Sequence, residues 1–575
     1  MPGFFGIINN SEDISEVEIR CEFYRPVICD EKKGLRYYFK RYVIPKFLND
    51  KVFDENATTI IGTDGILFNS QQLRKKYGVD TNFALIERIY SDYGIESISE
   101  MKGNFSGFIL NKNSHVVHVF TDHVGSKALF YFFDEEKKYL VFGSELKIIV
   151  AIMRKLGYTP RLSETGAYCL LTFGFMITDN TLVKEIKKIP PGSILTYSDG
   201  QIKIDRYYTF RSTPEVTDPE ETIIKKLNSL YLEAIKLEYE KDLEYNYSHI
   251  ATLSGGLDSR MNVLNAKKSG YSDILCVCFS QSNYLDEVIA KKIASDQGFD
   301  FIFHALDNGN YLKNIDEAVF VNEGLTLYAG ASHMQFTLTL IDLTKFGLLH
   351  SGDIAELVKG SYLINKNHNP VTINVMKKIA YSTKLLDEKI ILKMNLPKNY
   401  ENAELFTFYE RGVNGMFNGY RIIEQFTEFT SPFHDKDFLE YAMRIPPKYR
   451  FNEDLYLKWI LAEIPEASKY SWEKTGLKIN AGSLKKFVVS VFRFLKRKYL
   501  GQKFKDSMNP TEYWYYTNPW LKEVIDSYFT KNLGLLSKHP ALMNDTQRLF
   551  AEGNVREKTQ VLTLLSGIKL YDLNK

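Results

Sequence analysis

Residues 253–260 read Leu-Ser-Gly-Gly-Leu-Asp-Ser-Arg and decide the fold of the second half of the chain. They follow the short run 249–252, which predicts a buried parallel strand, and precede residues 261–264, which predict the first turn of a helix. Two adjacent glycines let the main chain approach an anion, while Ser254, Ser259 and the N–H groups of a new helix supply donors to phosphate oxygens. Asp258 would repel a bare phosphate, so it indicates a magnesium ion between them. The octet predicts a nucleotide-phosphate site; the alternative is a plain turn rich in Ser and Gly.

Residues 254–259, Ser-Gly-Gly-Leu-Asp-Ser, resemble the pyrophosphate-binding loop of the ATP pyrophosphatases, and specifically that of the asparagine synthetase family. The family usually continues with a second serine, where this chain has Arg260. An arginine at a helix start opposes the helix macrodipole, which is tolerable if the side chain faces a polyphosphate. The resemblance implies that the loop holds pyrophosphate and metal through Ser254, Gly255, Gly256, Asp258, Ser259 and Arg260, and that Leu253 and Val277 line the nucleotide.

Composition limits the class of protein. The chain has 575 residues, 44% of them hydrophobic and 25% charged, as in ordinary globular proteins, and is long enough for at least two cores. The net charge of +2 produces no field that favours nucleic acid. The start does not resemble a signal peptide, and no run of about 18 apolar residues predicts membrane insertion. The five cysteines, Cys21, Cys29, Cys169, Cys276 and Cys278, suit neither a metal site nor a disulfide framework, so a cytoplasmic protein is expected.

The first residues resemble the start of the family's glutaminase domain. They read Met-Pro-Gly-Phe-Phe-Gly, where the family has Met-Cys-Gly-Ile-Phe-Gly and uses the cysteine thiolate to attack glutamine. Pro2 has no thiol, and Ile66 replaces a glutamate that helps to hold the glutamine. Further segments resemble landmarks of the same domain: 63–69, 103–108, 121–127, 142–147 and 189–192. We therefore predict a glutaminase-like α+β domain over residues 1–212, with two antiparallel sheets between helix layers and a structural role; an altered small-molecule site is the alternative.

Residues 213–219 break this pattern and mark the start of a second domain, 213–575. Asp218 and Pro219 are predicted as N-cap and first residue of a long helix. The apolar run 274–279, which contains Cys276 and Cys278 as small core residues, is typical of a strand covered on both faces. Alternating strands and helices predict an α/β domain with a mostly parallel sheet and a helical C-terminal part. Ligands of such sheets bind outside the carboxyl ends of the strands.

A second segment is expected at the same sheet edge. Residues 351–362 match the family's Ser-Gly-Glu-Gly-Ala-Asp-Glu-Leu-Phe-Gly-Gly-Tyr without a gap. The match implies that Ser351 and Gly352 contact the nucleotide, that Asp353 lies beside the acyl centre, and that Glu356 binds Mg²⁺ beside Asp258. Glutamate and aspartate are exchanged at both acidic positions, which moves each charge by about a methylene. The alternative is a capped turn followed by a solvated acidic helix.

Two more segments resemble the family's catalytic motifs. Residues 428–435, Glu-Phe-Thr-Ser-Pro-Phe-His-Asp, resemble Glu-x-Arg-x-Pro-Phe-Leu-Asp, and the match with β-lactam synthetase makes Glu428 the expected partner of Asp353 in accepting an amine proton. Pairing of Glu428 with an arginine such as Arg421 is the alternative. Lys474, in Lys-Thr-Gly-Leu, resembles the lysine that neutralises the adenylate and pyrophosphate; Lys458 and Arg260 are further candidate phosphate cations.

Residues 484–505 combine apolar with basic side chains, a pattern that predicts a basic amphipathic helix. Its apolar face is expected to pack on the domain, with the charges in water. Contact with an anionic membrane surface or with a peptide substrate is the alternative.

Together these resemblances imply an AMP-forming amide ligase. A carboxylate would be activated with Mg²⁺ and ATP as an acyl-adenylate, and an amine would displace AMP without glutamine hydrolysis. The amine is expected on the substrate itself, a peptide being one such substrate, as in the β-lactam synthetases and lasso-peptide cyclases; a partner protein that delivers the substrate would fit this scheme. The alternatives are an asparagine synthetase that uses free ammonia, a non-catalytic scaffold of the same fold, and an ATP pyrophosphatase acting on another acceptor.

Overall fold

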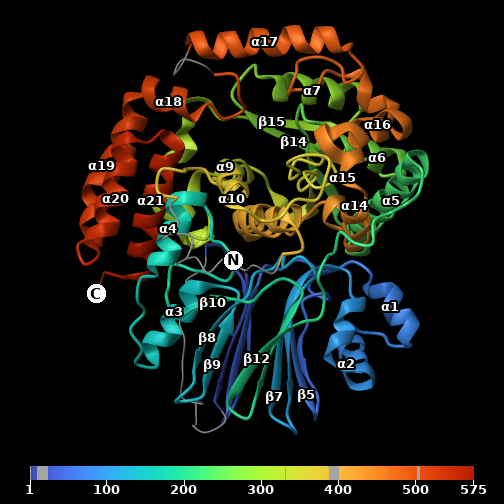
Figure 1. Ribbon diagram of the computed structural model, residues 1–575. Helices are drawn as coiled ribbons and strands as arrows, with labels where there is room; N and C mark the ends of the chain where they lie inside the picture. Colours follow the sequence, from blue (N-terminus) through green and yellow to red (C-terminus); the bar gives the residue numbers. More distant parts are fainter. Residues whose placement is uncertain (1, 10–23, 331, 387–399, 501–504, 575) are drawn as a thin grey trace.

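Two six-stranded antiparallel sheets form the lower part of the molecule in Figure 1. The computed structural model describes residues 2–9, 24–330, 332–386, 400–500 and 505–574. The first sheet has the order β10-β8-β9-β1-β3-β2 and the second β12-β11-β7-β6-β5-β4. The strands of the first sheet are β1 (Gly3–Asn9), β2 (Ile28–Gly34), β3 (Tyr37–Val43), β8 (Phe130–Asp134), β9 (Tyr139–Gly143) and β10 (Lys187–Lys188). Those of the second are β4 (Phe53–Glu55), β5 (Thr59–Leu67), β6 (Gly103–Asn111), β7 (Val116–Thr121), β11 (Ser193–Ser198) and β12 (Gln201–Arg206).

Side chains that alternate along the strands build separate cores on the two faces of each sheet. On β1, Phe4 and Ile8 join the core between the sheets, whereas Phe5 and Ile7 join the core that includes the helices α3 (Leu146–Lys155) and α4 (Glu164–Phe173). The helices α1 (Ser70–Tyr77) and α2 (Asn82–Tyr93) cover the second sheet. The predicted layers, two antiparallel sheets between helices, are confirmed.

The second half of the chain contains a five-stranded sheet with the order β15-β14-β13-β16-β17, in which every neighbouring pair is parallel. Its strands are β13 (Ser248–Thr252), β14 (Ile274–Ser280), β15 (Asp300–Ala305), β16 (Phe346–His350) and β17 (Phe429–Thr430). The predicted parallel sheet is thus confirmed. The strand order runs outward from β13 through β14 to β15, and the chain then returns to the other side of β13 to form β16. The carboxyl ends of β13 and β16 therefore mark a topological switch point, where such sheets bind ligands.

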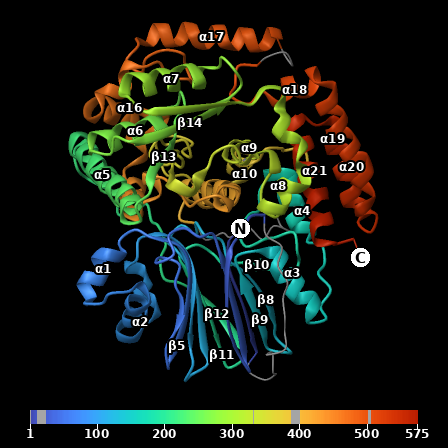
Figure 2. The same ribbon diagram turned by 180° about the vertical axis from the view of Figure 1, so that it is seen from behind.

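Helices pack around this sheet (Figure 2). The long helix α5 (Glu220–Glu244) begins one residue later than predicted, with Pro219 as its N-cap, because Pro219 has an extended ψ of 150°. The other helices of this half include α6 (Leu257–Lys268), α7 (Leu285–Gln297), α8 (Ile315–Asn322), α9 (Ser332–Leu338), α10 (Ile373–Ile379), α12 (Ala403–Thr407), the π-helix η5 (Phe408–Phe417), α13 (Asn418–Tyr420), α14 (Lys436–Arg444), α15 (Pro447–Arg450) and α16 (Asp454–Glu463).

The C-terminal helices return to the N-terminal half. They are α18 (Thr511–Thr517), α19 (Pro519–Asn532), α20 (Pro540–Glu552) and α21 (Val555–Tyr571). Helix α21 lies beside α4 (Figure 1). Its apolar side chains, such as Leu562 and Leu565, share one core with Leu170 and Leu171 of α4. The predicted helical C-terminal part is confirmed, and it joins the two halves through a common core.

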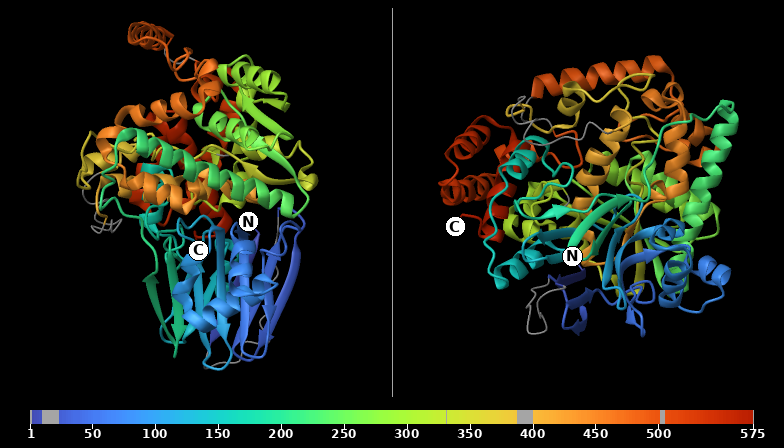
Figure 3. Two further views of the ribbon diagram at one scale, coloured as in Figure 1. Left: turned by 90° about the vertical axis from the view of Figure 1, so that its right-hand side faces the viewer. Right: turned by 60° about the horizontal axis from the view of Figure 1, so that its bottom comes forward.

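The basic segment forms the helix α17 (Ser483–Leu500), at the end of the molecule opposite the antiparallel sheets (Figures 1 and 3). Residues 501–504 of the predicted stretch lie outside the described residues. The expected packing of its apolar face on the domain is wrong: Phe492 is 66% exposed and Leu495 56%. Local patterning specifies an amphipathic helix, but it does not specify which surface covers the apolar face.

Cys276 and Cys278 are buried on β14, as predicted, and Cys169 is buried in α4. Cys29 is exposed on β2, and Cys21 lies outside the described residues. Within the described chain, no helix combines the length and the apolar character needed to cross a membrane.

Candidate functional site

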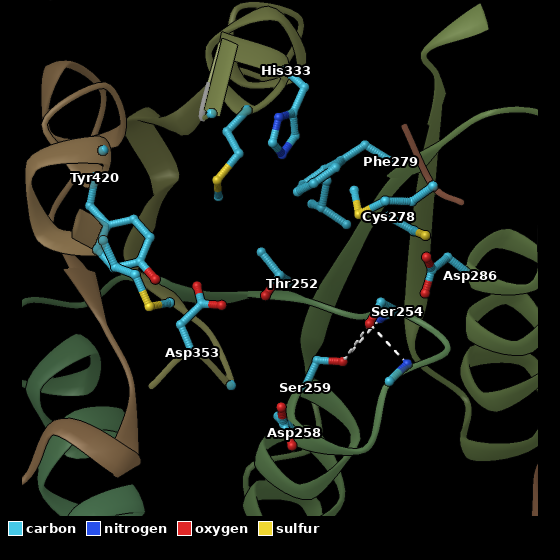
Figure 4. A pocket seen from close by; sticks show the side chains of 18 of the residues that line it. Thr252, Ser254, Asp258, Ser259, Cys278, Phe279, Asp286, His333, Asp353 and Tyr420 are labelled. Carbon is cyan, nitrogen blue, oxygen red and sulfur yellow. Dashed lines mark hydrogen bonds between the residues drawn. The ribbon is translucent and has the colours of Figure 1, made fainter. Parts of the chain in front are cut away.

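The loop that follows β13 is held in shape by its own hydrogen bonds (Figure 4). The Ser254 N–H donates to Ser259 Oγ over 3.1 Å, and the Gly256 N–H donates to Ser254 Oγ over 3.1 Å. The Gly255 N–H donates to Asp286 Oδ1 over 2.7 Å. Helix α6 begins at Leu257, one turn earlier than expected, because Gly256 is its extended N-cap. The octet therefore turns from a strand into a helix at the sheet edge, with serine hydroxyls and helix N–H groups facing the same space.

Gly352, at the carboxyl end of β16, packs directly against this loop. A Cβ atom at Gly352 would lie 2.2 Å from the carbonyl carbon of Asp258 and 2.3 Å from the Ser259 nitrogen. The neighbouring Ser351 is fixed on both sides, because its N–H donates to the Thr430 carbonyl over 2.9 Å and its carbonyl accepts from Asn262 Nδ2 over 2.6 Å. The two segments predicted to meet at this edge are therefore in backbone contact, and only glycine fits between them.

Asp353 directly follows Gly352 in the chain and lines the cavity that lies beside the loop. Burial, and then the negative charge of Glu356, raise its pKa to about 6. The Tyr420 hydroxyl hydrogen-bonds to the Asp353 carboxyl group and opposes this rise. Tyr420 ends α13 and packs against Phe429, with 4.1 Å between the ring centroids and 32° between the ring planes. A carboxylate with a pKa near neutrality, held by a tyrosine, can accept a proton from a bound substrate.

The loop and Asp353 border a cavity of about 400 Å³. One end is polar and carries Ser254, Ser259 and Asp258, whereas the other carries Cys278, Phe279 and His333 (Figure 4). Val277 and Met334 also line the cavity. An apolar end beside a loop of N–H and hydroxyl donors matches the two parts of a nucleotide, its base and its phosphates. Eight predicted residues line the cavity: Leu253, Ser254, Gly256, Asp258, Ser259, Val277, Gly352 and Asp353. Gly255 and Ser351 lie next to lining residues in the same loops.

Asp258 lines the cavity, and its negative charge interacts with that of the buried Glu356. Asp258 accepts hydrogen bonds from Lys359 Nζ over 2.8 Å and from the Tyr456 hydroxyl over 2.7 Å. The charge of Asp258 contributes, after burial, to a raised pKa of Glu356. Glu356 Oε2 is buried and has no hydrogen-bond partner among the described residues. Carboxylate oxygens, one of them unsatisfied, are the hard ligands that Mg²⁺ prefers, so these two residues fit the ion.

The structure corrects the expected position of Arg260. Its side chain is fully buried and donates to the carbonyls of Gly255, Ala467 and Ser471 over 3.0, 2.8 and 2.8 Å. Burial lowers the pKa of the guanidinium to about 10. Arg260 points inward from the first turn of α6, because the backbone carbonyls of residues 467–471 face it there. It supports the loop from behind and does not line the cavity.

Lys474 is also placed differently from the expectation. Its Nζ forms an ion pair with Glu453 over 2.9 Å, its side chain is 58% exposed, and it does not line the cavity. The Glu473 N–H nevertheless donates to the Gly255 carbonyl over 3.0 Å, so this segment borders the phosphate loop. The further candidate Lys458 is bound at the surface to Glu220 and Asp454.

Glu428 does not form the expected pair with Asp353. It is buried between Lys51 Nζ at 2.7 Å and Lys127 Nζ at 2.6 Å, two lysines supplied by the antiparallel part. Burial alone would raise the pKa of Glu428, but the charges of the two lysines hold it well below its usual range. The alternative partner Arg421 is paired with Glu323 instead. Glu428 is therefore an anion at neutral pH, at the contact between the two halves.

A buried cluster supports the Ser351 segment from below, and its role was not predicted. Asp242 Oδ2 accepts from His249 Nδ1 over 2.9 Å and from His350 Nε2 over 2.8 Å. Burial opposes a charge on His350, but Asp242 and Glu238 outweigh it and raise its pKa to about 9. Within the described ranges, Asp242, His249 and His350 form the one group of close potential metal ligands. Their mutual hydrogen bonds instead fix the residue that precedes Ser351.

Comparison with known proteins finds similarity to glutamine amidotransferase domains and to asparagine synthetases. Residues 50–208 match the family model of the glutamine amidotransferase domain. Asparagine synthetase [glutamine-hydrolyzing] 1 of Bacillus subtilis (strain 168) is 25% identical over 275 residues, which cover 46% of this chain and 42% of that relative. Asparagine synthetase B [glutamine-hydrolyzing] of Escherichia coli (strain K12) is 22% identical over 422 residues, which cover 69% of this chain and 64% of that relative. The chain is thus similar to asparagine synthetases at modest identity, and its residues 50–208 are similar to a glutamine amidotransferase domain.

The chain spans less than half the length of the first curated relatives that it matches. Among solved structures, glutamine phosphoribosylpyrophosphate (PRPP) amidotransferase from B. subtilis is 12% identical, with a TM-score of 0.26 and coverage of 52% of this chain and 65% of that chain.

The two positions at which the sequence departs from the resembled glutaminase domain, Pro2 and Ile66, are part of the core. Pro2 is buried at the start of β1, and Ile66 is 0% exposed on β5. Asp64, on the same strand, is buried, and its carboxylate lies 3.9 Å from Lys127 Nζ. Position 2 therefore carries no thiol nucleophile. The charged side chains of Asp64, Lys127 and Glu428 lie at the contact with the second half.

Proposed function

We propose that this chain is an AMP-forming amide ligase. A substrate carboxylate oxygen attacks the α-phosphorus of ATP, the bond to the β-phosphate oxygen breaks, and an acyl-adenylate and pyrophosphate form. An amine then attacks the acyl carbon, loses a proton and displaces AMP. The observation that carries the proposal is the contact of Gly352 with the Asp258–Ser259 backbone, which brings the phosphate loop and Asp353 to one cavity.

The loop residues are suited to hold the polyphosphate. Ser254 and Ser259 offer hydroxyl groups, and the first turn of α6 offers N–H groups and the positive end of its dipole. Asp258 and Glu356 would hold Mg²⁺, which when bound neutralises charge on the phosphates. Lys359 balances the charge of Asp258 from the other side.

Asp353 is assigned as the proton acceptor for the attacking amine, and Tyr420 as the group that positions its carboxylate. With a pKa of about 6, Asp353 is mostly ionised at neutral pH, and its pKa is high enough for the carboxylate to accept a proton from the amine. The lysine-bound Glu428 is not assigned a catalytic role.

The nitrogen comes from an amine on the substrate or from free ammonia, because Pro2 cannot form the thioester that glutamine hydrolysis in this family requires. A carboxylate and an amine carried by one substrate, such as a peptide, would meet in the same cavity. This favours amide formation within one substrate over an ammonia-dependent reaction.

Product analysis tests the proposal. The protein is incubated with Mg-ATP and a panel of carboxylates, with or without amines, ammonium or glutamine, and the nucleotide products are separated. Formation of AMP and pyrophosphate that depends on a carboxylate supports the ligase; formation of ADP and phosphate refutes it. Activity with aspartate and ammonium would establish the asparagine reaction. Release of glutamate from glutamine would contradict the inference that Pro2 prevents glutamine hydrolysis.

A further inference from the structure

Helix α17 differs in composition from the rest of this nearly neutral chain. Its 18 residues include six lysines and arginines and no aspartate or glutamate, against a net charge of +2 for the whole protein. Between the basic residues lie large apolar ones, and the hydrophobic residues recur at intervals of three and four. This combination predicts a helix with one apolar face and a strongly positive remainder.

The apolar face of α17 is open to solvent. Val488, Val491, Phe492, Leu495 and Tyr499 recur at intervals of three or four residues and therefore share one face. They are 57%, 40%, 66%, 56% and 90% exposed, respectively. Among the described side chains of α17 none is buried.

This exposure distinguishes α17 from the other long helices near the C-terminus. In α21, Val561, Leu562, Leu564, Leu565 and Ile568 are all 0% exposed. Contiguous exposed apolar side chains on one helix face mark a contact surface, because each large side chain left in water forgoes the stabilisation that burial would provide. In Figure 3, α17 stands at the outer edge of the molecule.

We propose that α17 binds the surface of an anionic lipid bilayer and lies in the plane of the interface. Apolar side chains inserted between the headgroups would be covered by acyl chains, and the basic residues would meet the anionic headgroups. The described lysines at the two ends of the helix, Lys485 and Lys498, are both exposed and available for this contact. The helix is not apolar enough to span a membrane, which agrees with a position on the surface.

The charge of α17 favours a bilayer over a second copy of the chain. Two copies paired through their apolar faces would bring twelve basic residues together without one acidic residue to balance them. A membrane surface offers an extended sheet of negative charge and an apolar interior, and therefore complements both parts of the helix. Electrostatic attraction to anionic lipid increases with each Lys or Arg near the surface.

The ends of α17 join segments that border the cavity described above. Before the helix, the Glu473 N–H donates to Gly255 of the phosphate loop. After it, the Met508 carbonyl accepts from the Gln281 N–H over 2.9 Å, and Met508 lines the cavity. Membrane binding would thus hold the cavity near the lipid surface, but the proposal itself does not depend on the catalytic function.

Vesicle co-sedimentation with the full-length protein tests the proposal. We expect at least tenfold stronger binding to vesicles of phosphatidylcholine and phosphatidylglycerol in equal parts than to phosphatidylcholine alone, and weaker binding as salt is added. The double variant Phe492→Ser and Leu495→Ser should lose at least tenfold in binding. The matched control Leu340→Ser, which removes a 67% exposed leucine elsewhere, should bind as the wild type does.

Circular dichroism and ATP binding without vesicles show whether each variant is folded, so that failure of membrane binding is separated from failure of the ligase reaction. Equal binding to both vesicle types, equal binding by the double variant, or no binding would overturn the proposal. Concentration-dependent dimerisation that the double variant abolishes would overturn it in favour of a second copy.

Discussion

Replacement of Gly352 by alanine tests the contact between the two loops. Its φ lies outside the left-handed region, so the effect is steric and not a backbone preference. The added Cβ would lie 2.2 Å from the Asp258 carbonyl carbon, whereas ordinary contact begins at 3.4 Å. The loops must therefore separate by about 1.2 Å. A misplacement of about 1 Å near reacting groups can cost roughly 100-fold in rate, or about 2.7 kcal/mol of transition-state stabilisation.

The assay is carboxylate-dependent pyrophosphate release, with kcat and the KM for ATP measured separately. We expect kcat/KM to fall about 100-fold in Gly352→Ala. The matched control is Gly330→Ala: Gly330 also lines the cavity, has a φ outside the left-handed region, and an added Cβ would meet nothing within 4 Å. Thermal denaturation with and without ATP separates lost binding from lost folding. If Gly352→Ala and Gly330→Ala have equal kcat/KM values, the reasoning is refuted.

Three further predictions concern buried charges. Lys127→Met should lower the free energy of unfolding by about 3–5 kcal/mol, because it removes one of the two lysines that neutralise the buried Glu428. The control Lys112→Met, which breaks the partly exposed pair with Glu55, should lower it by less than about 1 kcal/mol. Urea titration measures both values. The Glu428 pKa is lowered from 4.5 to about 2, so its stabilisation is complete above pH 4.5 and is lost as pH falls towards 2, which urea titration across this range measures. The rate of amide formation should fall as pH drops through about 6, where Asp353 gains a proton, and Tyr420→Phe should move this midpoint to higher pH.

Each of these has a clear contrary result. Equal loss of unfolding free energy in Lys127→Met and Lys112→Met would show that the buried Glu428 does not need the charge of Lys127. A stability that stays constant between pH 4.5 and 2 would contradict the lowered pKa of Glu428. A pH–rate midpoint that does not respond to Tyr420→Phe would remove the hydroxyl from its assigned position beside Asp353.

Local patterns predicted the architecture and the position of the loop. The octet at 253–260 contains its own strand end, turn and helix start, and its serines bond to each other within six residues. Gly352 was expected at the same edge because residues 351–362 resemble the family's motif, and because α/β sheets bind ligands outside the carboxyl ends of their strands. The loop depends on short-range geometry, whereas the place of Gly352 depends on the family resemblance.

Side-chain partners that come from distant segments could not be predicted in this way. Glu428 is bound by lysines more than 300 residues earlier in the chain, and Arg260 is bound by carbonyls of residues 467–471. Tyr420 carries no motif, and only the fold places it beside Asp353. The periodicity of α17 is the same for a packed helix as for one exposed at the surface, so its exposure was learned only from the structure.

The most direct measurement follows oxygen from the carboxylate into the nucleotide. A carboxylate substrate found in the product screen is labelled with ¹⁸O at both carboxyl oxygens and incubated with Mg-ATP and the amine, and the AMP is examined by mass spectrometry. If the carboxylate attacks the α-phosphate, one ¹⁸O atom appears in the phosphate group of each AMP. AMP without the label, or ADP and phosphate as the products, would contradict the acyl-adenylate reaction.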